Sequence, residues 1–210
     1  MTSKRRTPKV GFDLDGVILY NPTRVARPII STIKKVFFPR KKSTFYVPQS
    51  NISRGIWNVF HASSLFIESG YEHAKKLLKN GDIEGYIVTA RYGFLQDDFD
   101  KWKVRLEADE HFTASYSNQK DEQPHVYKQR MIEKLDLDYF IEDNWDIVRA
   151  LSTNPKNKRR KIIWIYNMLD RLVVKHPLAF PNLAHAIAWI EQDIKKATPA
   201  TMKKITKKKK

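Results

Sequence analysis

The stretch KVGFDLDGV, residues 9–17, decides the fold. Residues 9–12 form a short, mostly apolar run, and two carboxylates, Asp13 and Asp15, follow it directly with Gly16 behind them. Apolar runs bounded by polar residues are typical of strands buried on both faces of a parallel sheet. The stretch therefore predicts a central strand that ends in charged residues.

The same pattern recurs further along the chain. Further strands are predicted at 87–88, 139–141 and 161–166, with a weaker one at about 112–116. Segments with helical apolar spacing lie between them, at 69–79, 94–108, 124–135, 144–151 and from Pro181 onward. Alternation of strands and helices predicts an α/β fold with a parallel sheet and helices on both faces.

Two segments do not follow this alternation. Residues 20–67 carry Pro22, Pro28, Pro39 and Pro48, and we interpret them as a mainly helical cap insertion after the first strand. The catalytic core would then comprise residues 8–19 and 68–196. The run 197–210 is rich in lysine without apolar periodicity, which predicts a disordered tail.

Length and composition exclude several classes of protein. A chain of 210 residues suits one full domain with an insertion. The absence of cysteine excludes disulfides, thiolate metal sites and cysteine nucleophiles, and it is compatible with the cytoplasmic location that we expect. No run of about 18 apolar residues occurs, so no membrane span is expected. The basic N-terminus is not followed by an apolar segment and a small-residue cleavage site, so no secretory signal is expected.

Charge is the most unusual bulk feature. The chain has 39 Lys and Arg against 23 Asp and Glu, a net charge of +16, and residues 195–210 hold eight lysines and no acid. Basic runs attract polyanions by releasing counterions, which makes nucleic acid a possible partner. Such runs are also common as solvated, disordered segments.

Polar residues gather at the ends of three predicted strands. Asp13 and Asp15 follow the first, Thr89 follows the second, and Glu142 and Asp143 follow the strand after the Pro124 helix. In open parallel sheets, ligands bind beyond the carboxyl ends of the strands, so adjacent strands would bring four carboxylates into one crevice. Such a cluster needs a cation, and oxygen ligands without cysteine favour Mg²⁺.

These residues resemble the motifs of the haloacid dehalogenase (HAD) superfamily of phosphotransferases. FDLDGV at 12–17 resembles the first motif, IVTAR at 87–91 the second and FIED at 140–143 the fourth. Lys128 lies where the third motif is expected, with Lys134 as a nearby competitor. The match in order and spacing extends over about residues 8–195. It implies a HAD-like Rossmannoid three-layer αβα sandwich, with parallel strand order 3-2-1-4-5 and a small cap after strand one.

The resemblance also implies roles for these residues. Asp13 would attack phosphorus and form an aspartyl-phosphate, and Asp15 would act as general acid and base. Thr89 and Lys128 would bind the phosphoryl group. The predicted Mg²⁺ ligands are Asp13, the backbone carbonyl of Asp15, and Asp143, with Glu142 or Asp146 binding directly or through water. Weaker candidates for substrate binding are Gly16, Ala90, Arg91, Tyr20 and Arg24.

We therefore predict a Mg²⁺-dependent phosphomonoester hydrolase acting on a small phosphorylated substrate. The Thr-Ala-Arg sequence, small cap and chain length resemble the 5′-nucleotidase branch, which favours a nucleoside monophosphate. Dehalogenation is disfavoured because members that displace halide typically lack an acid at the position of Asp15. A sugar-phosphate phosphatase or mutase is an alternative, although residues 19–22 depart from the phosphoglucomutase pattern. The basic runs leave two further alternatives: a phosphatase of nucleic-acid ends, and a basic nucleic-acid-binding protein on the same scaffold.

Overall fold

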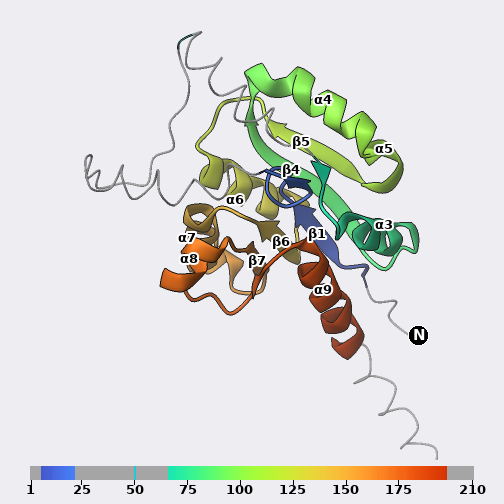
Figure 1. Cartoon of the computed structure of the whole chain (residues 1–210), viewed down its shortest axis with the longest axis vertical. Coiled ribbons are helices and arrows are strands. Elements are labelled where there is room, and N and C mark those ends of the chain that lie inside the picture. The colour runs from blue at the N-terminus through green and yellow to red at the C-terminus, as the bar shows by residue number, and fades with distance from the viewer. Residues whose placement is uncertain (1–5, 22–49, 51–65, 198–210) are drawn as a thin grey trace, which may run out of the picture.

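A parallel sheet forms the centre of the protein. The computed structural model describes residues 6–21, 50 and 66–197, and Figure 1 shows their arrangement. Within these ranges the main sheet has six strands in the order β5-β4-β1-β6-β7-β8, each parallel to its neighbours. The strands are β1 (Lys9–Phe12), β4 (Glu84–Tyr92), β5 (Ala114–Asn118), β6 (Tyr139–Glu142), β7 (Lys161–Ile165) and β8 (Ala179–Phe180). The strand order 3-2-1-4-5 is confirmed, with a sixth strand added beside β7.

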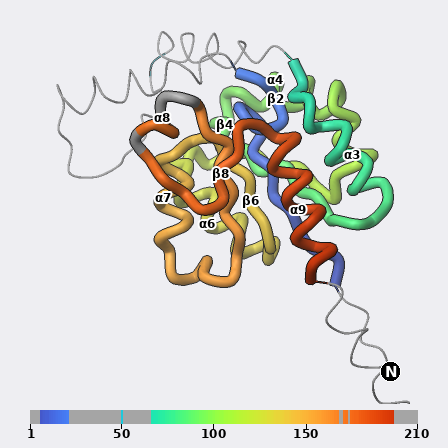
Figure 2. Tube along the Cα trace, turned by 60° about the horizontal axis from the view of Figure 1, so that its bottom comes forward, coloured from blue at the N-terminus to red at the C-terminus, as the bar shows by residue number. Residues whose placement is uncertain are grey.

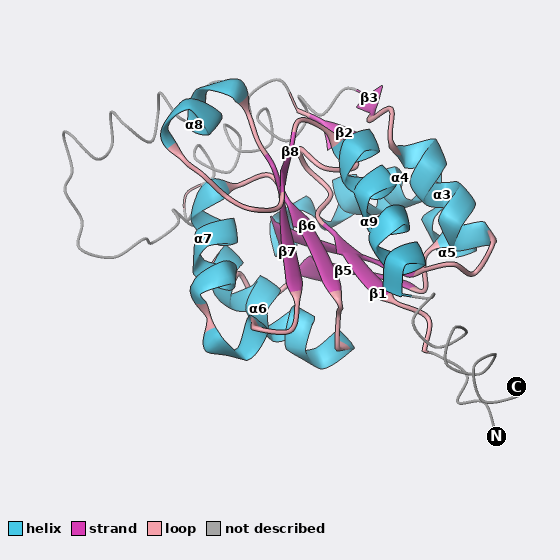
Figure 3. Cartoon of the chain, turned by 90° about the horizontal axis from the view of Figure 1, so that it is seen from below, coloured by secondary structure: helices cyan, strands magenta, loops and turns pink. Residues whose placement is uncertain are grey.

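Helices connect the strands and cover both faces of the sheet. They are α3 (Tyr71–Lys79), α4 (Gln96–Arg105), α5 (Ala108–His111), α6 (Pro124–Leu135), α7 (Trp145–Thr153), α8 (Met168–Val173) and α9 (Leu183–Ala197), with short 3₁₀ turns η2 (Gly93–Leu95) and η3 (Pro155–Asn157). Figure 3 shows the sheet between α6 and α7 on one side and α3 and α9 on the other. The predicted three-layer αβα sandwich is therefore confirmed.

The layers follow from alternation of side chains along the strands. Ile87 of β4 and Ile141 of β6 pack into the core beneath α3, α4 and α9. Their neighbours Val88 and Phe140 pack into the opposite core beneath α6 and α7. Successive residues of a strand point to opposite faces, so runs that are apolar throughout can bury both faces.

Three details differ from the sequence expectation. The segment 94–108 is divided into η2, α4 and α5, and Glu107, which lies between α4 and α5, adopts a left-handed backbone conformation (φ 50°) that ends regular helix. Strand β5 begins at Ala114, two residues later than expected. The short elements α8 and β8 were not predicted, because two or six residues leave too little periodicity to detect.

The predicted cap joins the core through a small second sheet. Strands β2 (Leu19–Tyr20) and β3 (Phe66–Ile67) pair antiparallel, so both ends of the predicted insertion leave the core side by side. The rest of the insertion, apart from Ser50, and the predicted tail after Ala197 lie outside the described residues. The helical content of the cap and the disorder of the tail stay predictions.

The two ends of the described chain lie together. Figure 2 shows the segment that leads into β1 beside the last turns of α9, at the opposite end of the molecule from β2 and β3. The last described residue, Ala197, therefore lies at the amino end of the sheet. None of the helices in the described ranges is long and apolar enough to cross a membrane.

Close packing between α3 and α9 provides a test of the fold. Gly70 precedes α3 with an ordinary helical backbone, and a Cβ atom there would lie 2.3 Å from the backbone nitrogen of Ala184. Because this neighbour is backbone and cannot rotate away, we expect Gly70→Ala to destabilise the protein by about 1–3 kcal/mol, the usual cost of overpacking. Urea denaturation followed by circular dichroism measures the loss.

Gly81 supplies the matched control for this substitution. It has φ +72°, and a Cβ there would meet nothing within 4 Å. Asparagine tolerates the left-handed conformation, so Gly81→Asn should cost far less than Gly70→Ala. Equal stability of the two variants would contradict the packing argument.

Candidate active site

The ends of three adjacent strands bring the predicted residues together. Phe12 of β1 pairs with Ile87 of β4 on one side and Ile141 of β6 on the other. The residues that follow these positions therefore leave the sheet at the same carboxyl edge. The backbone N–H of Asp13 donates to the carbonyl of Ile141 (3.0 Å), which holds the start of the following loop against β6.

A buried lysine connects two of the carboxylates. The Nζ atom of Lys128 lies 2.8 Å from Oδ2 of Asp13 and 2.5 Å from Oε2 of Glu142. All three residues are buried. Lys128 lies on the buried stripe of α6 with Pro124, Met131 and Ile132, spaced as one face of a helix.

This geometry distinguishes the two candidate lysines. Lys134 lies elsewhere on α6, with its Nζ atom 5.6 Å from the centre of the Tyr116 ring. Of the two, Lys128 is the lysine that contacts the clustered carboxylates. The spacing of the apolar residues of α6 was the available signal, because Lys128 shares their face and Lys134 does not.

Burial and the neighbouring opposite charges shift the pKa values of Asp13, Glu142 and Lys128 in opposite directions. Burial raises the pKa of Asp13, and Asp143 raises it further, while the ammonium group of Lys128 lowers it. Burial likewise raises the pKa of Glu142, with Lys128 opposing the shift. The two carboxylates together raise the pKa of Lys128 above its ordinary value despite its burial, so this side chain stays protonated.

Three carboxylates are arranged to hold a cation. Oxygen atoms of Asp13, Glu142 and Asp143 lie within 4.8 Å of one another. Clustered carboxylate oxygens are the donors that Mg²⁺ prefers, so the residues fit the predicted ion. Glu142 has further roles, because its Oε1 atom accepts from the backbone N–H of Asn144 (2.9 Å) while Oε2 contacts Lys128.

Two other predicted ligands have different positions. Asp146 lies in the first turn of α7 with a side chain 31% exposed, contacts Arg149 at 3.5 Å and is not among the three clustered carboxylates. The structure therefore does not bring Asp146 into the cluster. The Asp15 carboxylate is also outside the cluster, and metal binding by its backbone carbonyl stays a prediction.

Contacts from neighbouring elements fix Asp143. The indole N–H of Trp164, at the end of β7, donates to the backbone carbonyl of Asp143 (3.2 Å). Gly16 has φ +81°, and a Cβ there would lie 2.2 Å from Oδ2 of Asp143. A glycine is thus required at this turn both by its backbone conformation and by the carboxylate that packs against it.

Arg91 forms a contact that the sequence analysis missed. Its Nε donates to Oδ2 of Asp15 (2.8 Å) and its Nη2 to Oδ1 (2.7 Å), a bidentate pair. Its Nη1 donates to Asp98 of α4. The signal was the position of Arg91 itself, two residues after Thr89, because a cation at that strand end faces the same crevice as the carboxylates.

An irregularity in β4 carries this part of the site. Val88 pairs with Tyr116 of β5 and Tyr92 pairs with Asn118, so β4 has two more residues than β5 between these pairs. A bulge of this kind re-aims side chains and is common beside active sites. The predicted motif Thr89-Ala90-Arg91 is the bulged segment.

Three of the remaining candidates for substrate contact are among the described residues. Thr89 is buried, and its Oγ1 atom accepts from the backbone N–H of Arg91 (3.3 Å). Ala90 packs against the core beneath α6 and α7. The ring of Tyr20 stacks on that of Phe66, with centres 5.2 Å apart. Arg24 lies outside the described residues.

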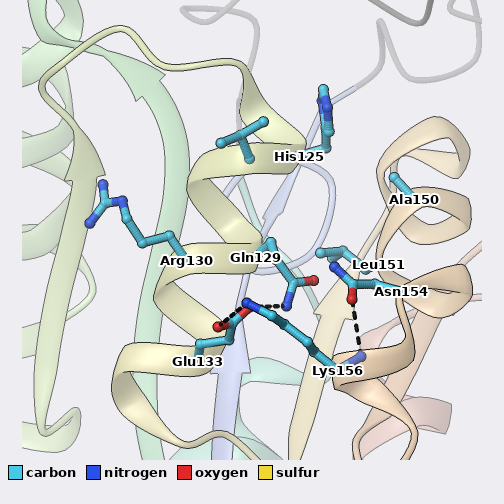
Figure 4. Close-up of a pocket in the computed structure, with 9 residues that line it drawn as sticks. His125, Gln129, Arg130, Glu133, Ala150, Leu151, Asn154 and Lys156 are labelled. Carbon is cyan, nitrogen blue, oxygen red and sulfur yellow. Dashed lines mark hydrogen bonds and ion pairs between the residues drawn. The ribbon is translucent and has the colours of Figure 1, made fainter.

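A groove elsewhere on the surface is separate from these residues. It has a volume of about 450 Å³ and lies between α6 and α7, as Figure 4 shows. Within its lining, Lys156 contacts Glu133 at 3.0 Å. None of the predicted site residues lines it.

Comparison with solved structures identifies the fold. A HAD-superfamily hydrolase from Ehrlichia chaffeensis matches with a TM-score of 0.50 and 12% identity, covering 90% of this chain and 98% of that one. A family IA, variant 3 HAD hydrolase from Entamoeba histolytica matches with a TM-score of 0.54 and 11% identity, covering 86% and 99%. A CbbY mutant from Rhodobacter sphaeroides, in complex with xylulose-(1,5)bisphosphate, matches with a TM-score of 0.54 and 12% identity, covering 85% and 96%.

Sequence comparison adds no closer relative. The chain matches no protein-family model, and a search of curated proteins finds no match. At 11–12% identity the structural matches establish the fold, which is that of HAD-superfamily hydrolases. The expected likeness to the 5′-nucleotidase branch stays a prediction.

The buried position of Lys128 leads to a stability prediction. Removing one partner of a buried ion pair typically costs about 3–5 kcal/mol, because it leaves an uncompensated charge. We expect Lys128→Met to lower the free energy of unfolding by an amount of this order at pH 8 in EDTA, as measured by urea denaturation. The control Lys134→Met, on the same helix, should change little.

The loss should also depend on pH with a definite sign. Without Lys128, the folded-state pKa values of Asp13 and Glu142 rise further above their unfolded values. Stability from a group with a raised folded pKa is present at low pH and is lost as pH rises through that pKa. The deficit of Lys128→Met should therefore be smaller at pH 5 than at pH 8, and a pH-independent deficit would contradict this account.

Proposed function

We propose that this chain belongs to the HAD superfamily and is a Mg²⁺-dependent phosphomonoester hydrolase with Asp13 as nucleophile. One observation carries the proposal: Asp13 contacts Lys128 and lies beside Glu142 and Asp143 at the carboxyl edge of a HAD-like sheet. Each motif alone is weak, but their convergence on one buried cluster satisfies the geometric criteria for a reactive site.

The described residues support a division of roles. Asp13 attacks phosphorus and displaces the substrate alkoxide, which gives an aspartyl-phosphate. Burial raises the pKa of Asp13, and the ammonium group of Lys128 opposes this shift, which favours the carboxylate form that attacks phosphorus. The Asp15 carboxylic acid protonates the leaving oxygen, and the resulting carboxylate then takes a proton from the water that hydrolyses the intermediate.

Asp13 and Asp143 are the proposed protein ligands of Mg²⁺. The Oε2 atom of Glu142 contacts Lys128 and its Oε1 atom accepts from the backbone N–H of Asn144, and we assign Glu142 chiefly to holding Lys128. When bound, Mg²⁺ would neutralise negative charge on the phosphoryl group and the carboxylates.

A nucleoside monophosphate is the substrate that we favour. The stacked pair of Tyr20 and Phe66 lies directly after the nucleophile loop, and Phe66 is 55% exposed. An exposed aromatic ring offers a surface on which a base can stack, typically with about 1–3 kcal/mol per base. A sugar phosphate is the competing small substrate, as in the CbbY complex among the structural matches.

A phosphorylated nucleic-acid end is a second candidate substrate, favoured by the distribution of charge. Residues 1–5, 22–49, 51–65 and 198–210 together hold 16 Lys and Arg and no Asp or Glu. The remaining residues therefore carry 23 charges of each sign, and the whole net charge of +16 belongs to these four segments. Residues 22–65 leave the core from β2 and β3, beside the proposed nucleophile loop.

The proposed chemistry predicts a specific pattern of losses. Asp13→Asn should lower kcat for p-nitrophenyl phosphate by at least about 10³-fold, because an amide does not attack phosphorus. EDTA should abolish the wild-type activity and added Mg²⁺ restore it, while Asp143→Asn should need more Mg²⁺ for half-maximal rate. Steady-state assays over a Mg²⁺ series measure all three effects.

The control for these variants is Asp97→Asn, on the exposed first turn of α4. It should behave as wild type at every Mg²⁺ concentration. A folded Asp13→Asn protein with near-wild-type activity, or full activity of metal-free wild type, would refute the mechanism.

Substrate class can be tested by salt and by truncation. If the substrate is a nucleoside monophosphate, deleting residues 198–210 should change kcat/KM by no more than a few-fold at physiological salt, because distant charges are screened. If it is a phosphorylated oligonucleotide, the deletion should weaken binding and make the log–log salt dependence shallower. The measurement is kcat/KM for a nucleoside monophosphate, a sugar phosphate and a phosphorylated oligonucleotide across a salt series. A large, salt-dependent loss confined to the oligonucleotide would replace the small-molecule assignment.

A further inference from the structure

Asp15 forms a bidentate ion pair with Arg91. Arg91 directs two parallel N–H groups at the two oxygens of the Asp15 carboxylate, at 2.8 and 2.7 Å. Such fork-to-fork pairing fixes the plane and direction of a carboxylate as well as its charge. Both side chains are buried, with 1% of Arg91 and 8% of Asp15 exposed.

Arg91 is itself anchored from the side away from Asp15. Its third contact is with Asp98 of α4, a side chain 38% exposed. Three of the N–H groups of Arg91 are thus directed at carboxylates of the protein. Arg91 therefore connects the end of β4 to the start of α4 through Asp98. Its Nε and Nη2 groups point toward Asp15 in the loop after β1.

This geometry separates the roles of the two neighbouring acids. Asp13 lies with Lys128, Glu142 and Asp143, whereas the side chain of Asp15 lies outside that carboxylate cluster. A general acid works only when its oxygen is within hydrogen-bond reach of the leaving oxygen. A carboxylate next to Asp13 that could rotate freely would often be directed elsewhere, including toward the metal ligands.

We propose that Arg91, anchored by Asp98, is the positioning residue for the general acid and base Asp15. This inference rests on the proposed function, in which Asp15 protonates the leaving group. Arg91 does not contact the substrate in this assignment, and its effect passes through the orientation of Asp15. Substrate binding by Arg91, which its place in the sequence first suggested, is the competing role.

Leaving-group dependence tests the proposal. The value of kcat/KM reports the steps up to transfer of the phosphoryl group, and general acid catalysis contributes most there when the leaving alcohol is poor. We expect Arg91→Lys to lower kcat/KM for β-glycerol phosphate by about 10–100-fold, a part of the 10²–10⁴-fold typical of acid–base catalysis. The loss for p-nitrophenyl phosphate, whose leaving group needs little protonation, should be much smaller, and KM should change little for either ester.

Lysine is an informative replacement because it keeps the positive charge of Arg91 but cannot form the bidentate pair of hydrogen bonds to the Asp15 carboxylate. If Arg91 supplied charge alone, Arg91→Lys would behave as wild type, and the proposal would be wrong. Asp98→Asn keeps the fork and weakens its anchor, so we expect a smaller loss with the same leaving-group dependence. Arg105→Lys, on the exposed side of α4 beside Trp102, is the matched control and should have no effect.

A double variant tests whether Arg91 acts through Asp15. In an Asp15→Asn background, Arg91→Lys should cause no further loss, because the group that it positions is gone. Additive losses, or an equal loss for both esters with a raised KM, would overturn the proposal and indicate a direct contact with the phosphoryl group. If Arg91→Lys does not fold, Asp98→Asn and its combination with Asp15→Asn carry the same test.

The same assays separate this inference from the proposed function. A wild type that hydrolyses neither ester, or an Asp13→Asn variant that remains active, defeats both. An active wild type and an inactive Asp13→Asn, together with an unchanged Arg91→Lys, defeat only the role of Arg91.

Discussion

The ion pair between Lys128 and two buried carboxylates is the contact on which the site depends. Taking a carboxylate out of water costs several kcal/mol unless a partner compensates it. One ammonium group from α6 compensates both Asp13 and Glu142, which come from different strands. The position of α6 relative to the ends of β1 and β6 is therefore tied to the charge of the site, because a shift of the helix would leave both carboxylates buried without a partner.

A second cation, Arg91, allows two acids that are close in the sequence, Asp13 and Asp15, to be buried together. Asp13 and Asp15 are two residues apart and both buried, yet each is paired with its own cation, Lys128 from α6 and Arg91 from β4. The two cations come from different elements, and each contacts only one of the two carboxylates. The loop between them can then hold one acid for attack on phosphorus and the other for proton transfer.

Much of this arrangement follows from short patterns in the sequence. Apolar runs that end in Asp13, Thr89 and Glu142 predicted the strands, and parallel pairing explains why their ends converge. The choice between Lys128 and Lys134 needed the face of α6, and the partner of Asp15 needed tertiary structure, because Arg91 is 76 residues away in the chain. The break at Glu107 was also hidden, since a left-handed residue other than glycine leaves no compositional mark.

The bulge in β4 has a consequence for how this motif can change during evolution. Because the excess of β4 over β5 is an even number of residues, the alternation of inward and outward side chains is the same before and after it. A relative that gained or lost two residues here could change how far the residues corresponding to Thr89-Ala90-Arg91 extend from the sheet, while both cores stay intact. A change of one residue would instead turn Tyr92 from one face of the sheet to the other. Length variation among relatives of this chain should therefore occur in pairs at this position.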